Sequence, residues 1–328
     1  IDMVRFKIVK LTFQSPLHIG RGLGEAYDTA EKTMHSDTIS GALASTFCLL
    51  HPGEDPLTFM KTFKVSSAFP FIEDHFFLPR PLTRMDLSLS GNEKYEHKKI
   101  LKKVEYVEVS LWSLLVSGDK IEVPSENLSS GGKFLYADKV SGKEPYKDAL
   151  QQRVTVPRDG GNATPYFIER RYFNENAGLF FLLDTNDEHL EKIKDVLEHL
   201  KDVGFGTDKS VGNGQFSFGI SEIEIAVSEG FPKRMLISLA CPEKHEISTE
   251  MLRKSSYLLS RRGGFIAGTS MDQFRHLRKR SVYMFLEGSV FPMGDFLGKI
   301  ENVRPTWNDE LLHNVYRDGR AFFLPVNI

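Results

Sequence analysis

The sequence of 328 residues has little cysteine and no long apolar run. Its two cysteines, Cys48 and Cys241, lie within apolar stretches, which disfavours a disulfide framework or a zinc site and predicts buried thiols in a reducing compartment. No run of 18 apolar residues occurs, and the N-terminus lacks the pattern of a signal peptide. We therefore expect a cytoplasmic protein that has no membrane partner.

The chain also has almost no net charge, since 42 Lys and Arg residues are balanced by 44 Asp and Glu residues. Long-range attraction to nucleic acid is thus not expected, and such a site would need local clustering. Basic residues do gather at predicted turns beside glycines or aromatics, which suits a single RNA strand, although ordinary surface charge gives the same composition. These residues are Arg21, Arg80, Arg84, Arg153, Arg158, Lys209, Arg261, Arg262 and the run 275–280.

A glycine-rich loop, residues 204–214, lies between a predicted helix and a predicted strand. Glycine permits positive φ and close approach of the backbone to a ligand, and the pair Lys209-Ser210 suits a phosphate. This pair lies mid-loop and a strand follows, which disfavours a nucleotide-binding P-loop. Plain turn geometry is the alternative explanation. The loop's glycines are Gly204, Gly206, Gly212 and Gly214.

Apolar periodicity predicts an α+β fold for residues 3–227. Alternating positions indicate a first strand with a possible bulge near Ile8, and helical spacing follows from Ser36 or Asp37 as N-cap. A buried strand, a second helix that ends at Gly204 and a last strand complete the order βαββαβ, the ferredoxin-like unit. Between them the pattern loosens, which predicts a large insertion over about residues 54–177.

Residues 233–328 repeat the order of strand, helix and strands more loosely. A strand is predicted from residue 235, a helix over 250–260, a strand over 281–291 and a closing strand near the C-terminus. We therefore expect a second, smaller ferredoxin-like domain.

Residues 151–173 predict a long β-hairpin. Two alternating segments flank Arg158-Asp-Gly-Gly-Asn162, a strong turn signal, and Arg153 and Tyr166 lie in the predicted strands. A two-stranded arm is marginal by itself, so it should rest on a ligand or on a neighbouring subunit.

Catalytic and metal-binding patterns are sparse. Metal-free RNA cleavage needs a general base and a general acid, and His18 is the histidine that follows the first strand within a glycine-bearing loop. The same histidine would equally serve as a hydrogen-bonding or stacking group. His35 and Asp37 are too few ligands for a metal, so we expect neither a metal nor a cofactor.

Several motifs then point to one family. The first half carries Pro16-Leu-His-Ile-Gly-Arg-Gly22, Ser36-Asp-Thr-Ile-Ser-Gly-Ala-Leu43, Phe69-Pro-Phe71, Phe77-Leu-Pro-Arg-Pro81 and the loop 204–214. Together these resemble the RAMP superfamily of CRISPR effector proteins. The second half carries Gly263-Gly-Phe265, Tyr283-Met-Phe-Leu-Glu-Gly-Ser-Val-Phe291 and Gly298-Lys-Ile-Glu-Asn-Val-Arg-Pro305. These are similar to the family of subunit four of type III-A Csm complexes.

The resemblance implies a noncatalytic subunit with two ferredoxin-like domains. It implies that the chain holds the five-prime handle of the CRISPR RNA and contacts the large polymerase-like subunit and a backbone subunit. The hairpin matches the thumb that kinks the guide RNA and its target in that family. The implied RNA-binding residues are His18, Gly20, Arg21, Ser36, Arg153, Arg158, Gly204, Phe205, Gly206, Lys209, Ser210, Gly212, Gly214, Arg261 and Arg262.

Phe205 departs from the family pattern, because many relatives carry two adjacent glycines where this chain has Gly204-Phe-Gly206. The bulkier ring would either hold this part of the loop farther from RNA or stack on a base. Two other hypotheses stay open beside an RNA-binding scaffold. One is a metal-independent endoribonuclease that uses His18 on precursor CRISPR RNA, and the other is a structural adaptor whose basic turns face acidic subunit surfaces.

Overall fold

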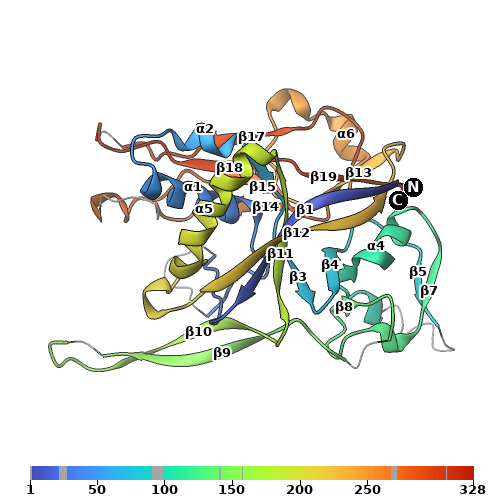
Figure 1. Ribbon diagram of the computed structural model, residues 1–328, viewed down its shortest axis with the longest axis horizontal. Helices are drawn as coiled ribbons and strands as arrows, with labels where there is room; N and C mark the ends of the chain where they lie inside the picture. Colours follow the sequence, from blue (N-terminus) through green and yellow to red (C-terminus); the bar gives the residue numbers. More distant parts are fainter. Residues whose placement is uncertain are drawn as a thin grey trace.

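The computed structural model describes residues 2–21, 28–90, 99–139, 142–156, 158–266, 272–307 and 309–328. Its largest element is an eight-stranded sheet in the first two thirds of the chain (Figure 1). The strands are β1 (Asp2–Phe13), β2 (Phe63–Val65), β3 (Phe69–Ile72), β4 (His75–Pro79), β6 (Tyr106–Glu108), β8 (Phe134–Leu135), β11 (Ala177–Thr185) and β12 (Phe216–Val227). Their order is β12-β1-β11-β3-β4-β6-β8, and β2 also pairs with β11. The mixed α+β class is therefore confirmed.

Two helices, α1 (Ser36–Leu50) and α5 (Asp187–Val203), pack on one face of this sheet. The Asn186 side chain caps α5 by accepting a hydrogen bond from the His189 amide at 2.9 Å, and Gly204 ends the helix with a positive φ of 87°. Strands β12, β1, β11 and β2 with these helices have the order and the crossovers of a βαββαβ unit. The predicted helices thus lie close to their predicted positions.

The predicted bulge near Ile8 is wrong, because β1 pairs with β12 without interruption from Asp2↔Val227 to Phe13↔Phe216. The change of apolar phase marks two buried faces instead. Val9 and Leu11 face the core under α1 and α5, whereas Ile8 belongs to the core on the opposite side of the sheet. A strand that is buried on both faces loses the simple alternation of a half-buried strand.

Much of the predicted insertion extends the sheet. Strands β3, β4, β6 and β8 continue it, and helix α4 (Val109–Val116) covers the opposite face. Trp112 of α4 is fully buried and donates a hydrogen bond from Nε1 to the Pro79 carbonyl at 3.2 Å. Strands of two to five residues carry too little periodicity to be read from sequence. The described residues of this segment also form α2 (Pro56–Met60), β5 (Leu87–Leu89), β7 (Ile121–Val123) and the 3-10 helix η1 (Ser125–Asn127).

The predicted hairpin is formed by β9 (Tyr146–Thr155) and β10 (Thr164–Phe173), and it projects from the body of the molecule (Figure 1). Its base is held by its own chain. Arg171 donates hydrogen bonds to Asp148 at 2.8 and 3.1 Å and to the Lys32 carbonyl at 2.9 Å. The paired strands begin at Tyr146, five residues before the predicted start.

The second half contains three small sheets, β16-β13-β19, β14-β15 and β17-β18. Its α-helix α6 (Thr249–Arg253) ends before residue 260, so the predicted helix over 250–260 is wrong beyond Arg253. The predicted strand 281–291 is two strands, because the chain turns at Gly288, where φ is +84°. The bounds are β13 (Lys233–Leu236), β14 (Leu259–Arg262), β15 (Val282–Phe285), β16 (Val290–Pro292), β17 (Gly298–Asn302), β18 (Tyr316–Arg320) and β19 (Phe323–Val326). The short 3-10 helices are η2 (Lys209–Val211), η3 (Lys244–Glu246) and η4 (Asp272–Phe274).

The two halves share a core. Met235, Ile237 and Leu324 of the second half lie in the same apolar cluster as Phe180 of β11. The Ser67 amide also donates a hydrogen bond to the Ile237 carbonyl at 2.9 Å. The domain limits 3–227 and 233–328 and the second ferredoxin-like unit stay predictions. Among the described helices, none has the length and apolarity that a membrane crossing requires.

Candidate functional site

The glycine-rich loop packs against the segment that follows β1. The Thr207 amide donates to the His18 carbonyl, and the Gly214 amide donates to the Pro16 carbonyl, both at 2.9 Å. Three glycines have no room for a side chain. A Cβ on Gly206 would collide with the His18 carbonyl, and Cβ atoms on Gly204 and Gly214 would collide with the loop's own backbone. These three glycines therefore serve turn geometry and close packing, and their contact with RNA stays a prediction.

The outer edge of the loop is different. Lys209 and Ser210 are exposed, and a Cβ on Gly212 would meet nothing within 4 Å. Asp208 precedes them in the left-handed conformation with φ +58°. Residues 209–212 are therefore the part of the loop that can meet a ligand.

Phe205 does not have the predicted role. Its side chain is 1% exposed and stacks on Phe216, with 5.1 Å between the ring centroids. A ring in the core below α5 is not available to a base, so the expected stacking on RNA is corrected. An aromatic between two glycines fills the space that the turn leaves in the core.

His18 is also buried, at 1% exposure. Its Nδ1 donates a hydrogen bond to the Glu169 carbonyl of β10 at 2.5 Å, since a carbonyl oxygen can only accept. With the Thr207 contact to its carbonyl, His18 links the segment after β1, the hairpin and the glycine loop. The prediction that the His18 ring contacts RNA directly is therefore corrected. Its role is to position these three segments. Neighbouring Gly20 is half-buried against Thr207, and Arg21 is exposed.

Arg170 joins this site, although the sequence reasoning missed it. It lies at the base of the hairpin with 4% exposure, and its Nη2 is 3.8 Å from a carboxylate oxygen of Asp208 in the glycine loop. Among the described residues, its Nε and Nη2 have no hydrogen-bond acceptor, and neither does Nδ2 of the buried Asn213. Buried donors without partners are rare, so an acceptor from outside the chain is expected here. The sequence signal was the pair Arg170-Arg171 near the end of the second predicted hairpin strand.

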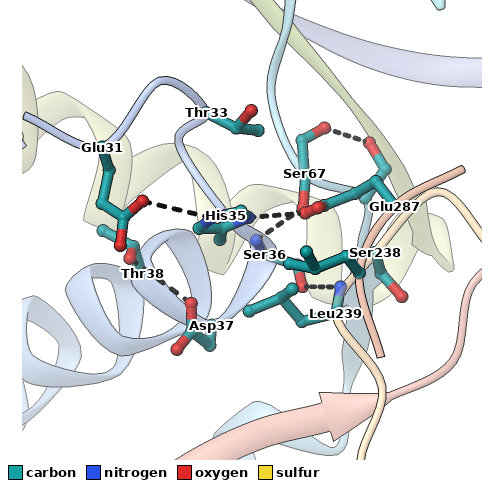
Figure 2. A network of polar contacts seen from close by, with 12 residues as sticks. Glu31, Thr33, His35, Ser36, Asp37, Thr38, Ser67, Ser238, Leu239 and Glu287 are labelled. Atoms are coloured by element: carbon teal, nitrogen blue, oxygen red, sulfur yellow. Dashed lines mark hydrogen bonds and ion pairs between the residues drawn. The ribbon is translucent and has the colours of Figure 1, made fainter. Parts of the chain in front are cut away.

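Ser36 has a structural position at the start of α1. Its amide donates to Ser67 Oγ, and its Oγ accepts a hydrogen bond from the Leu239 amide of the second half, both at 2.9 Å (Figure 2). Its hydroxyl therefore does not cap α1 and is not available to RNA, because it satisfies a buried amide across the junction of the two halves. Both predictions for Ser36 are corrected.

Arg262 is paired with carboxylates at the same junction of the two halves. It donates to both Asp37 carboxylate oxygens at 3.0 Å and to Glu31 at 3.0 Å, and Arg317 also bonds Asp37. Burial opposes ionisation of Asp37, but the two arginines outweigh it and hold the pKa of this carboxyl far below its usual range. The expectation that Arg262 binds RNA is therefore corrected, because its charge is already paired and its side chain is only 11% exposed.

His35 lies beside this cluster, between Glu287 and Glu31 (Figure 2). Its Nδ1 is 2.8 Å from a Glu287 carboxylate oxygen, and Ser67 also bonds Glu287. Burial lowers the pKa of His35, but the charge and the hydrogen bond of Glu287 outweigh burial and raise the pKa to about 9. The imidazole is thus positively charged at neutral pH and joins the halves.

The remaining predicted residues are on the surface. Arg153 is half-buried in β9, Arg158 is exposed at the hairpin turn, and Arg261 is exposed on β14. In the part of the chain that the structure describes, no three His, Cys, Asp or Glu side chains gather as a metal site would require. Cys48 and Cys241 are half-buried free thiols.

Comparison with known families now defines the class of protein. A model of the RAMP superfamily matches residues 10–217, which is more than half of the chain. The chain therefore belongs to the RAMP superfamily. A model of the CRISPR Csm4 C-terminal domain matches residues 230–326.

Relatives agree along the whole length. A CRISPR system Cms protein Csm4 from Methanocaldococcus jannaschii is 24% identical over 99% of this chain and 98% of its own. A protein of the same name from Streptococcus thermophilus is 24% identical over 98% of this chain and 99% of its own. Among solved structures, one of a Csm1–Csm4 cassette in complex with pppApA matches with TM-score 0.63, 21% identity and 98% coverage of both chains. One of a Csm3–Csm4 subcomplex matches with TM-score 0.63 and 18% identity, over 98% of this chain and all of that chain.

Proposed function

We propose that this chain is a noncatalytic subunit of a type III-A CRISPR (Csm) complex and holds the five-prime, repeat-derived handle of the CRISPR RNA. One observation carries the proposal. Three segments far apart in sequence meet at the glycine loop, and beside these contacts two buried donor groups, on Arg170 and Asn213, lack acceptors among the described residues. Phosphate oxygens are acceptors of the required kind. Lys209, Ser210 and Arg21 would add exposed donors and positive charge to this site.

The proposed place in the complex follows from the relatives. The solved Csm1–Csm4 and Csm3–Csm4 structures have this fold. By analogy, the chain would connect the large polymerase-like subunit to a backbone subunit. The hairpin β9–β10, with Arg153 and Arg158, would lie near the guide RNA and its target. Both halves would then be variants of the ferredoxin-like unit, the second one reduced in its helices.

Binding of handle RNA to a charge variant tests the site. Lys209→Ala together with Arg21→Ala should weaken binding of an RNA oligomer that carries the handle by about tenfold at moderate salt, because two phosphate contacts are lost. The matched control is Lys139→Ala with Lys254→Ala, which removes two exposed lysines in surface ion pairs elsewhere. Equal affinities of the two double variants in a filter-binding titration would refute the site.

The enzyme hypothesis has its own test. The pure chain is incubated with labelled precursor CRISPR RNA in the absence of metal. We expect no cleavage, because the His18 imidazole is buried and donates to a backbone carbonyl. Site-specific cleavage that His18→Ala abolishes would replace the scaffold by an endoribonuclease.

A further inference from the structure

A two-stranded ribbon in the second half, residues 259–266 and 277–285, carries a strongly basic exposed surface. Strands β14 and β15 pair from Leu259↔Phe285 to Arg262↔Val282. The antiparallel course continues beyond them, since the Lys279 amide donates to the Gly264 carbonyl at 2.9 Å and Phe265 bridges to Arg278. We call this element the basic ribbon.

The basic ribbon has one face in the core. Ile266, Leu277 and Met284 are buried, and Arg262 points to the Asp37 cluster. Tyr283, by contrast, is 66% exposed and lies directly opposite the exposed Arg261. Directly opposed residues share a face of an antiparallel pair, so this tyrosine and this arginine are neighbours on the solvent side.

The charged side chains of the basic ribbon are all positive. The basic ribbon contains five Lys and Arg residues and no Asp or Glu, in a chain whose net charge is −2, and three of the five, Arg261, Arg278 and Arg280, are exposed. Within the described structure, neither Arg261 nor Arg278 has a carboxylate partner, and Arg280 donates to the neutral Asn302 carbonyl. Three exposed arginines without a carboxylate partner favour a polyanion as the ligand of this surface.

Aromatic rings are interleaved with these arginines. The Arg278 guanidinium lies 4.7 Å from the centre of the Phe265 ring, which is itself part exposed, and Tyr283 adds a second exposed ring. Exposed aromatics beside arginines are the groups on which unpaired bases stack, and this stacking tolerates any base. An acidic protein surface would use the charges but would leave the rings without a function.

We propose that the basic ribbon is a second binding surface, separate from the glycine loop, for single-stranded RNA. Arg261, Arg278 and Arg280 contact phosphates, and Tyr283 and Phe265 receive unpaired bases. The inference rests on the proposed RNA-binding function only for the identity of the RNA. The alternation, the charge and the exposed rings belong to the ribbon itself.

The test uses the full chain and a fluorescent, mixed-sequence single strand about 20 nucleotides long that lacks the handle, long enough for one or two single-strand sites. Arg261→Ala with Arg278→Ala should weaken binding at least tenfold and reduce the slope of log affinity against log salt by about 1.4, which corresponds to two single-strand phosphates. Tyr283→Ala should weaken binding about fivefold or more and leave the salt slope unchanged, because stacking releases no counterions.

Two controls complete the design. Lys139→Ala with Lys254→Ala removes the same charge elsewhere and should keep the affinity. A duplex of the same sequence should be insensitive to Tyr283→Ala, because its bases are already stacked. Unchanged affinity of the ribbon variants for the single strand overturns the inference. So does normal RNA binding combined with loss of copurification with other complex subunits, which would make the ribbon a protein interface.

The ribbon and the glycine loop can fail independently. If the Lys209 and Arg21 variant binds handle RNA normally while the ribbon variants lose the single strand, the handle site is wrong and the ribbon inference holds. If the loop variant loses handle RNA while the ribbon variants keep the single strand, the ribbon inference is wrong and the handle site holds.

Discussion

Gly206 and Gly212 have nearly the same positive φ, +85° and +83°, but different surroundings. A side chain on Gly206 would collide with the His18 carbonyl, whereas one on Gly212 would meet nothing within 4 Å. Alanine variants of these two glycines therefore distinguish two contributions to the free energy of unfolding. One is the cost of a positive φ in a residue with a side chain, and the other is the cost of a steric collision. The two positions also separate the part of the loop that packs inward from the part that can meet a ligand.

Gly206→Ala and Gly212→Ala should therefore differ in stability. Gly212→Ala should lower the free energy of unfolding by about 1 kcal/mol, the cost of a left-handed alanine. Gly206→Ala carries that cost and also forces the loop away from His18, so we expect a loss of about 3 kcal/mol or more. Urea unfolding of both variants gives the comparison. Equal losses would mean that the loop is not held against His18.

The same scale explains several residues whose type suggested a ligand. His18, Phe205 and Arg262 belong to residue types that often contact RNA. Each is instead satisfied inside the chain, by the Glu169 carbonyl, by the Phe216 ring and by Asp37 respectively. The type of a residue does not predict whether its side chain is buried. Burial decides which of these side chains a ligand can reach.

At the scale of elements, the hairpin β9–β10 has a base and a tip with different functions. The base is fixed by the bidentate contact between Arg171 and Asp148 and by Arg171 over the Tyr146 ring, 3.5 Å from its centre. The tip carries Arg153 and Arg158 away from the body. The stabilising contacts of the hairpin described here thus lie at its base, where it joins the body of the molecule.

A shortened hairpin tests this division. When Asn-Gly replaces residues 153–166, the pair Gln152↔Phe167 closes the turn, and the free energy of unfolding should change by less than about 1 kcal/mol. Arg171→Gln at the base should instead cost about 3 to 5 kcal/mol, because it leaves Asp148 without its buried partner. Thermal unfolding and urea titration of both variants measure this. A large loss from the shortened tip would contradict the assignment.

Across the whole molecule, a buried polar network fixes the two halves to each other. Asp37 of α1 bonds Arg262 and Arg317 of the second half, and His35 bonds Glu287. Leaving one buried charge without its partner costs more than the pair contributes, so the network opposes separation of the halves. The shared apolar core acts in the same direction.

The charge of His35 makes stability depend on pH. The folded chain keeps this proton up to pH about 9, whereas an unfolded histidine loses it near pH 6.5. The folded state therefore binds more protons between these values, and stability should fall as pH rises from about 6.5 to 9. Urea unfolding at several pH values should show this decline for the native chain and a flatter profile for His35→Gln. The exposed His199→Gln is the control. Parallel profiles of the native chain and His35→Gln would contradict this role.

The sequence by itself determined the α+β class, helices α1 and α5, the glycine loop after Gly204 and the hairpin, because these depend on periodicity and on local turn residues. It also carried the family motifs. Only the tertiary structure decided that the two phases of β1 are two buried faces, that Ser36 and Arg262 join the halves, and that Arg170 reaches the glycine loop. These contacts connect residues far apart in the chain, and no local pattern encodes which distant group will satisfy a buried donor.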